Sequence, residues 1–298
     1  MLSQCASLKI AASCFGLACA GVAGVFLAAT AFAAPGTTSP PEFSPSPDVG
    51  WIAYGPEFIP VPNEHRPVGS DPAHPWVPNA IEYLSARPDA KVSEQSTFPV
   101  ADLSNPILQP WAREELRKLN DRVLAGKPLD ARQASCWPIG VPGFLLYPVN
   151  PVFIIQAPKE VLMIWQSDHM VRHVYLNVPH SLHVRPSWFG ESVGHYEGDA
   201  LVVDTIGMTT KTFIDNYRTP HTDRLHVIER FHTVEGGKTM EVSVHVEDPG
   251  AFTAPWGGMQ RYARVQRAPL AEQSCAENNV NYLNQDVEPM PEAASPDF

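Results

Sequence analysis

The sequence is poor in basic residues. Its 298 residues include Lys+Arg 21 against Asp+Glu 32, which gives a formal net charge of −11. It has no run or stripe of basic side chains, so nucleic acid and anionic lipid are excluded as main partners. Hydrophobic residues make up 44% of the chain, which is enough to build a core and excludes a chain that is disordered throughout.

Motifs for nucleotide cofactors and metal ions are absent as well. There is no G-x-G-x-x-G, and Gly-Lys-Thr at 237–239 lacks the upstream glycine of a phosphate-binding loop. Pairs such as His180 with His183, or His221 with Asp223, could share an ion, but none has a recognised zinc spacing. We therefore predict neither a cofactor nor a metal.

Cysteine is scarce, and three of the five cysteines lie in the first 19 residues. This segment has the features of a secretory signal: Lys9 precedes an uncharged apolar run over residues 10–32, and Ala31-Phe32-Ala33 is a small-x-small cleavage site. We predict a signal peptide at residues 1–33, a periplasmic or secreted protein, and no membrane association after cleavage. Because the apolar run is long, an uncleaved membrane anchor is the alternative.

The two remaining cysteines, Cys136 and Cys275, fit one disulfide in an oxidising compartment. Such a bond would join the start of the main domain to its end. Two separate thiols are the alternative, and the sequence does not decide between them.

Proline is concentrated near the N-terminus, with 16 of the 31 prolines between Pro35 and Pro110. Proline lacks an N–H and disfavours helix before it, so this stretch is not expected to form a regular helix or a central strand. It also contains large apolar side chains such as Trp51, Phe58 and Trp76. We predict an irregular arm over residues 34–110 whose aromatic groups pack on the main domain.

Beyond the arm, periodicity predicts one helix and then a series of strands. Residues 111–124 place Leu116, Leu119 and Val123 on one stripe, before Gly126. The predicted strands are 152–156, 161–165, 170–176, the hairpin 192–197 with 200–205, and the hairpin 226–233 with 239–246. This pattern predicts a mostly β domain over residues 111–280, either an antiparallel barrel of lipocalin or calycin type or a sandwich, followed by a disordered tail at 281–298.

The last hairpin can be registered by arithmetic. A turn at Gly236-Gly237 pairs residues whose numbers sum to 473, so Val227 faces Val246 and Phe231 faces Val242, while the charged residues share the other face. Glu229 is the misfit, because it lies on the apolar face opposite Val244. A buried carboxylate must be paired, hydrogen-bonded or protonated, and these conditions suit either a structural ion pair or a general acid or base.

Two other charged residues are predicted to point the same way. Arg172 shares the parity of Met170 and Val174, and Asp204 shares the parity of Val202, although the opposite parity of that strand is equally apolar. If the three converge, Arg172, Asp204 and Glu229 form a polar island inside the barrel, either a structural triad or an acid–base site. His221, just before a strand, is predicted at the rim of the barrel.

A serine hydrolase is a further alternative. Residues 190–194 match G-x-S-x-G around Ser192, but an esterase requires a strand–turn–helix there and the following residues predict a hairpin. For substrate contacts we predict the aromatic residues Tyr175, Trp188 and Trp256, together with His195.

Several motifs resemble those of an uncharacterised family of secreted bacterial proteins. They are CWPIGVP at 136–142, GHYEGDALVVDT at 194–205, PHTDRLHVIERF at 220–231, and CAENN at 275–279. The resemblance covers about residues 130–280. It implies a common fold and an envelope location, and it implies no reaction.

We predict a cofactor-independent lyase, isomerase or hydratase that acts on a small apolar or aromatic molecule in an interior pocket. Glu229 or Asp204 moves the proton, Arg172 holds an anionic oxygen, and His221 assists at the rim. The alternatives are a carrier of a hydrophobic small molecule without chemistry, and a serine hydrolase that uses Ser192. The sequence does not indicate the oligomeric state.

Overall fold

The computed structural model describes residues 40–76, 98–127, 129, 136–147, 150–166, 170–266, 270 and 275. All of them belong to one unit, Thr38–Phe298. The predicted signal peptide at 1–33 and the predicted tail at 281–298 lie outside the described residues. Within the described part, no helix has the length and apolar composition needed to cross a membrane.

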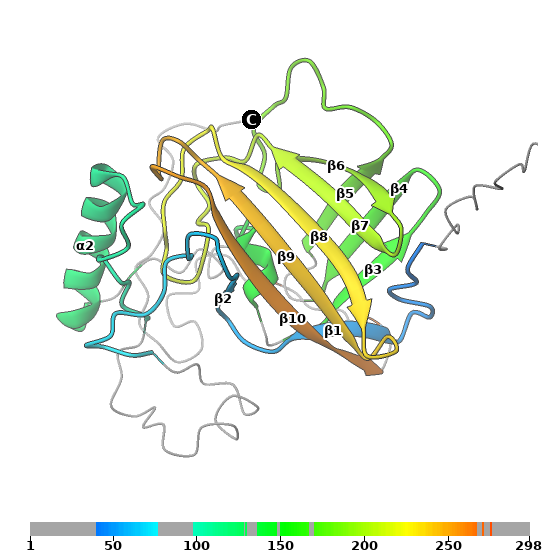
Figure 1. Ribbon diagram of the computed structural model, residues 1–298, viewed down its shortest axis with the longest axis horizontal. Helices are drawn as coiled ribbons and strands as arrows, with labels where there is room; N and C mark the ends of the chain where they lie inside the picture. Colours follow the sequence, from blue (N-terminus) through cyan, green and yellow to red (C-terminus); the bar gives the residue numbers. More distant parts are fainter. Residues whose placement is uncertain are drawn as a thin grey trace, which may run out of the picture. The chain divides into compact units, whose positions relative to one another are not determined.

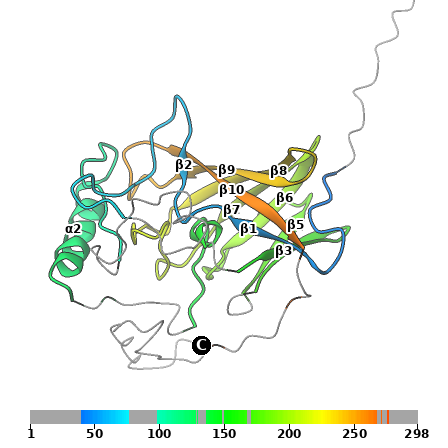
Figure 2. The same cartoon turned by 90° about the horizontal axis from the view of Figure 1, so that it is seen from below.

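The central element is a closed β-barrel, so the predicted mostly β barrel is confirmed (Figures 1 and 2). The strands are β1 Val49–Ala53, β2 Ile59–Pro60, β3 Val152–Gln156, β4 Glu160–Trp165, β5 Met170–Leu176, β6 Glu191–Glu197, β7 Ala200–Ile206, β8 His226–Val234, β9 Thr239–Glu247 and β10 Trp256–Gln266. The sheet order is β1-β3-β4-β5-β6-β7-β8-β9-β10, and β1 also pairs with β10, which closes the barrel. The short strand β2 adds to β10 outside this closed set.

One pairing in the barrel is parallel. Nine strands cannot alternate in direction around a closed ring, so at least one neighbouring pair must run the same way. That pair is β5 and β6, and the long connection between them, residues 177–190, permits it. The other barrel pairings are antiparallel, as predicted.

The register of the last hairpin agrees with the arithmetic. Val227 pairs with Val246, Glu229 with Val244, and Phe231 with Val242. The turn is longer than the predicted two residues, because pairing stops at Val234 and Thr239 and residues 235–238 form the turn. The sum of paired numbers is unchanged, so every side chain keeps its predicted face.

The predicted irregular arm contains a strand of the barrel. β1 pairs with β3 on one side and with β10 on the other, and all five of its residues are buried. The expectation of no central strand was wrong because prolines flank this window, at Pro47 and Pro56, but do not enter it. An average over residues 34–110 concealed a proline-free stretch that is long enough for one strand.

The longest strand, β10, was missed from the sequence. Its second and third residues are Gly257 and Gly258, which weaken a strand pattern. One of its inward residues is polar: Gln260 is buried and donates to the carbonyl oxygens of Gly55 and Glu57. The apolar alternation that identifies a strand is therefore interrupted where β10 supports the chain around β1.

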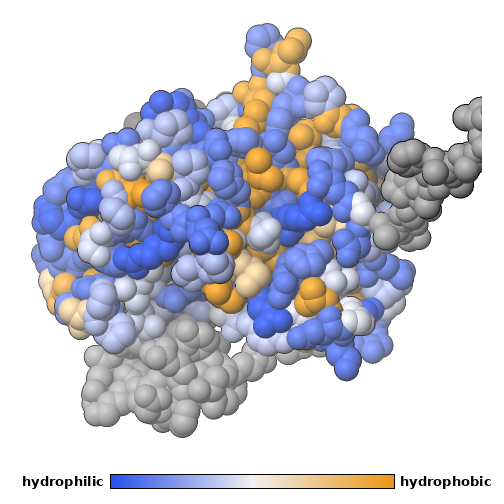
Figure 3. Space-filling view, viewed as in Figure 1, coloured by the Kyte–Doolittle hydropathy of each residue, from blue (hydrophilic) through white to orange (hydrophobic). Residues whose placement is uncertain are grey.

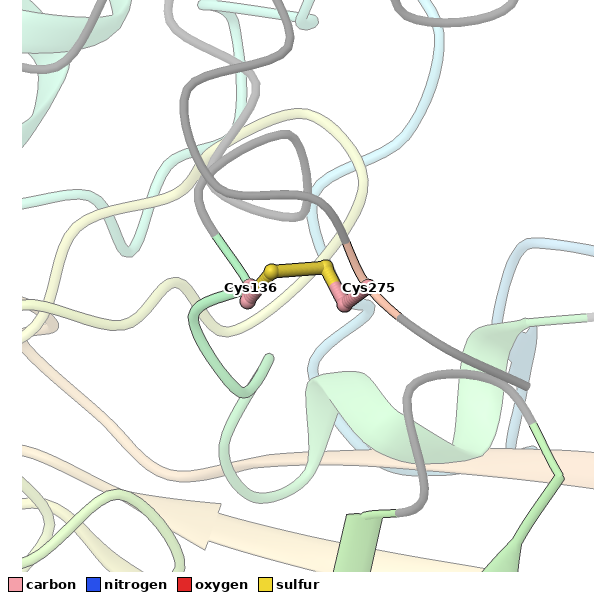
Figure 4. Close-up of a disulfide and its surroundings, with 2 residues drawn as sticks. All are labelled: Cys136 and Cys275. Carbon is pink, nitrogen blue, oxygen red and sulfur yellow. A yellow bond between two sulfur atoms is a disulfide. The ribbon is translucent and has the colours of Figure 1, made fainter. Parts of the chain in front are cut away.

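The predicted helix and the disulfide are both present. The helix α2, Pro110–Leu124, lies outside the barrel (Figure 1) and buries Leu116 and Val123. Cys136 and Cys275 form a disulfide (Figure 4), which closes a loop across 139 positions of sequence. In the chain-entropy model, a loop of this length stabilises the fold by about 4–5 kcal/mol.

Candidate functional site

Arg172 and Glu229 meet inside the barrel, where the strand parities predict them. The Arg172 side chain is 1% exposed and that of Glu229 is 0% exposed. Nη1 of Arg172 donates to Oε1 of Glu229 at 2.9 Å, and Nη2 donates to Oε2. Two parallel N–H···O bonds give the strongest geometry for a guanidinium and a carboxylate.

The remaining groups around this pair are hydrogen-bonded as well. Nε of Arg172 donates to Ser192 Oγ at 3.1 Å, and Nη2 donates to Thr205 Oγ1 at 2.8 Å. The guanidinium lies 5.1 Å from the centroid of the Phe144 ring. Four neighbouring strands, β5 to β8, thus each contribute one side chain to a buried network. A network so fully bonded is suited to hold strands in register, and it leaves little bonding capacity for a substrate.

Tyr262 is buried in the same interior, close enough to Arg172 and Glu229 to respond to their charges. Its hydroxyl donates to the carbonyl oxygen of Leu145 at 2.7 Å. Burial raises the pKa of Tyr262 well above its usual value, and the negative charge of Glu229 raises it further, while Arg172 opposes the shift. The phenol is therefore a neutral hydrogen-bond donor at physiological pH.

The serine-hydrolase alternative is wrong in its geometry. Ser192 lies within strand β6 and points into the barrel, where it is 1% exposed. Its Oγ is hydrogen-bonded to Arg172 and to Thr205. A nucleophile elbow requires an exposed serine at a strand–turn–helix junction, and Ser192 meets neither condition.

Asp204 does not join the interior pair, which corrects the predicted convergence of three residues. Leu201, Val203 and Thr205 take the inner face of β7, and the Asp204 side chain is 40% exposed on the outer face. Both parities of β7 are apolar, so the local pattern could not decide. There the Oδ1 of Asp204 accepts from two imidazoles, His180 Nε2 at 3.0 Å and His226 Nε2 at 2.9 Å.

The outer face continues this alternation of imidazoles and carboxylates across β8 and β9. His226 Nδ1 lies 3.9 Å from Glu247 Oε2, and Glu247 Oε1 lies 3.1 Å from His245 Nε2. His245 Nδ1 in turn lies 3.7 Å from Oε2 of Glu64, which comes from the segment between β2 and α2. Residues distant in sequence thus form one row. Sequence reasoning placed His226 opposite Glu247 and named Asp204 and His180 separately, but it did not bring them together with His245 and Glu64.

Two cavities lie at the end of this row, on the outside of the barrel. One has a volume of about 470 Å³ and is lined by Asn63, Glu64, His65, His245 and Pro255. The other has a volume of about 240 Å³ and is lined by Val61, Glu64, Val202, Ile228, Arg230, Ser243, Val244 and His245. Because they share Glu64 and His245, we treat them together as the outer hollow. Figure 3 shows apolar residues among polar ones on the face that carries β8 and β9.

Glycine at 257 makes room for one wall of the outer hollow. Gly257 on β10 is the cross-strand partner of His245, and its N–H donates to the carbonyl oxygen of His65. A Cβ atom at this position would lie 2.0 Å from Glu64 Oε2. The carboxylate of Glu64 therefore occupies the space that a side chain at 257 would take.

The other predicted site residues do not gather at one place. His221 is buried rather than at the rim: Nε2 lies 2.8 Å from Thr212 Oγ1, and Nδ1 lies 2.9 Å from the carbonyl oxygen of Thr222. Trp256 is 1% exposed in the core and packs against Phe58 and Phe252.

The remaining predicted contacts point outward or toward other groups. Tyr175 is 47% exposed on the outer face of β5. His195 is exposed beside Glu197, with 2.9 Å between His195 Nε2 and Glu197 Oε1. Trp188 contacts Trp137, with 5.0 Å between the ring centroids. These residues therefore do not line one common pocket with Arg172 and Glu229, and the predicted arrangement is corrected.

Sequence reasoning missed the buried carboxylates Asp102, Asp215 and Asp248, of which Asp215 has a raised pKa. Asp215, in the chain between β7 and β8, accepts hydrogen bonds from Thr219 Oγ1 and from the backbone N–H groups of Tyr217 and Thr219. Burial raises the pKa of Asp215 to about 6, although these hydrogen bonds oppose the shift. It lies in an irregular loop, where no strand parity indicates burial.

Among the residues that the structure describes, no group of three or more His, Cys, Asp or Glu side chains is arranged to hold a metal ion. A scan against protein-family models finds no family that matches the chain, and searches of curated proteins and of solved structures find no match either.

Proposed function

We propose that the protein is a cofactor-independent acid–base enzyme, of lyase or isomerase type, that acts on a small, largely apolar molecule in the outer hollow. The observation that carries the proposal is the position of His245, which lies between two carboxylates where the two cavities meet. The site predicted from sequence, Arg172 with Glu229, is assigned instead to holding the barrel together.

The hydrogen-bond partners of His245 determine which of its ring nitrogens carries the free lone pair. A carboxylate accepts hydrogen bonds, so we assign the proton to Nε2 of His245, which donates it to Glu247 Oε1 at 3.1 Å. In the neutral imidazole the lone pair is then on Nδ1. This atom lies 3.7 Å from Glu64 Oε2, which is too far for a direct hydrogen bond and too close for a substrate atom to fit between the two. A substrate therefore approaches Nδ1 from the larger cavity, which both residues line.

This arrangement has the parts that proton abstraction requires. A base is oriented by a second group on one side and open to a cavity on the other. The larger cavity, at about 470 Å³, is an open depression on the surface, so it can accept part of a small molecule without enclosing it. Val61, Val202 and Ile228 supply an apolar wall for the body of the molecule.

The test follows exchange of benzylic protons of phenylacetone and of phenylpyruvate for deuterium in D₂O by NMR. These probes share one carbon skeleton and an acidic C–H, and only the second carries a carboxylate. We expect the wild-type protein to accelerate exchange of at least one probe, and His245→Asn to reduce that rate roughly 10²- to 10⁴-fold. His232→Asn is the matched control, because His232 lies beside Glu241 on the same outer face and lines neither cavity.

Gly257→Ala supplies a second variant that leaves His245 in place. The new methyl group displaces the carboxylate of Glu64 from its position beside His245 and so changes the wall of the outer hollow. We therefore expect slower proton exchange, with little loss of stability. If the wild-type protein exchanges neither probe, or if His245→Asn exchanges both as fast as wild type, the enzyme proposal is overturned. Binding without exchange would identify a carrier.

A further inference from the structure

Arg230 is set into the wall of the outer hollow beside a hydroxyl group. Arg230 on β8 pairs across the sheet with Val202 on β7 and with Ser243 on β9, and all three line the smaller cavity. Directly opposed side chains have Cβ atoms about 4.5–5.5 Å apart. The guanidinium and the Ser243 hydroxyl can therefore contact the same ligand group. Among the residues that line the hollow, Arg230 alone carries a permanent positive charge.

The present partner of Arg230 is weakly held. Nη1 of Arg230 donates to Oε2 of Glu197 at 2.6 Å, and both side chains are about half exposed. Exposed ion pairs of this kind contribute little stability, because water screens both charges. An anion in the hollow can replace Glu197, or can bind the other N–H groups of the guanidinium, at small cost.

The positions of the remaining lining residues define the rest of the ligand. Ser243 and His245 lie two residues apart on one face of β9, roughly 7 Å along the strand. A carboxylate on Arg230 and Ser243 therefore leaves room for a short carbon chain that ends beside His245. Ile228 is the cross-strand neighbour of His245 and offers apolar surface between the two ends.

We infer that the outer hollow selects small organic monocarboxylates with an apolar body, and that Arg230 and Ser243 bind the carboxylate. The inference rests on the proposed function in placing the ligand in the same hollow, and it identifies the substrate class. In the acid–base reaction, the bound carboxylate fixes the substrate so that the C–H bonds at the other end of its carbon chain face His245.

The test compares 3-phenylpropionate with 3-phenylpropanamide, which differ in charge and share one skeleton. Dissociation constants are measured by NMR titration at low ionic strength. Because hydrogen bonds to a charged group are worth about 1.5–3 kcal/mol, we expect the carboxylate to bind roughly tenfold to a hundredfold more tightly than the amide. The difference should shrink as salt is added.

Two substitutions should move this preference in opposite directions. Arg230→Gln should bring the carboxylate to the affinity of the amide. Glu197→Gln removes the competing carboxylate and should tighten carboxylate binding roughly two- to fivefold. Arg261→Gln is the matched control, because Arg261 is an outer-face arginine that pairs with Glu241 and lines neither cavity.

Equal affinity for the two probes in the wild-type protein would overturn the inference, as would a preference that survives Arg230→Gln. Failure of the two proposals can be told apart. If the carboxylate preference depends on Arg230 while proton exchange does not depend on His245, the anion site stands and the enzyme assignment fails. If exchange depends on His245 without any carboxylate preference, the enzyme assignment stands and the substrate class is wrong.

Discussion

The inner and outer faces of strand β8 use charge in opposite ways. On the inner face, Glu229 is fully buried and meets Arg172 through two parallel hydrogen bonds. On the outer face, the flanking Ile228 and Arg230 line a cavity, and Arg230 has only an exposed carboxylate as partner. Two consecutive residues thus belong to two environments, one saturated and one open to solvent.

The comparison separates stabilising charge from charge that can recognise a ligand. Inside the barrel, an unpaired ion would cost several kcal/mol, so the network must be complete before the fold is stable. Outside, water replaces any lost partner, and the groups stay free to exchange one partner for another. The inner pair also fixes the position of β8, and therefore the position of the outward residues beside it.

Breaking the inner pair should have the largest effect. Glu229→Gln leaves the guanidinium of Arg172 without its counter-charge in the barrel, and we expect a loss of about 3–5 kcal/mol in the free energy of unfolding, measured by urea denaturation. Glu241→Gln, on the outer face of the same hairpin, is the control and should cost less than about 1 kcal/mol. Similar losses in the two variants would contradict the distinction between the faces.

The double variant Arg172→Met with Glu229→Leu sharpens this result. The double variant leaves no unpaired charge inside the barrel, so most of the free energy of unfolding lost in Glu229→Gln should be recovered. A double variant as unstable as Glu229→Gln would show that the pair contributes stability beyond mutual neutralisation.

Asp215 is a buried carboxylate that has no arginine bonded to both of its oxygens, and its effect on stability should depend on pH. Its pKa is raised to about 6 in the folded protein from 3.8, so the folded state binds the proton more tightly than the unfolded state. The contribution of this proton to stability is complete below about pH 4 and is lost as pH rises through 6, with a total of about 3 kcal/mol. In Asp215→Asn, thermal unfolding between pH 4 and pH 7 should show a pH dependence reduced by this amount. An unchanged pH profile would place the titration elsewhere.

The outer row should tolerate substitution with the smallest change in stability. In Asp204→Asn, two imidazoles lose a charged acceptor at a half-exposed position. We expect a loss below about 1 kcal/mol in urea denaturation, and a smaller loss at high salt because surface charges are screened. A loss as large as that of Glu229→Gln would mean that the outer row is structural too.

The buried pair of Arg172 and Glu229 could be predicted because it depends on alternation along single strands. Alternation along β8 and β9 placed Glu229 on the apolar face, and the parity of β5 added Arg172, because strand side chains alternate with a period of two. The same rule failed for Asp204, since both faces of β7 carry apolar side chains. The position of His221 also lay beyond the rule, because a loop has no periodicity.

The sequence alone determined the strands β3 to β9, the pairing within the two predicted hairpins and the presence of a charged residue on an apolar face, because these depend on nearby residues in the chain. Only the tertiary structure decided which residues surround the outer hollow. Glu64 reaches His245 and Gly257 across about 180 and 190 positions of sequence, through the packing of the segment after β2 on the barrel. Contacts of that range depend on the whole fold, and a local pattern does not record them.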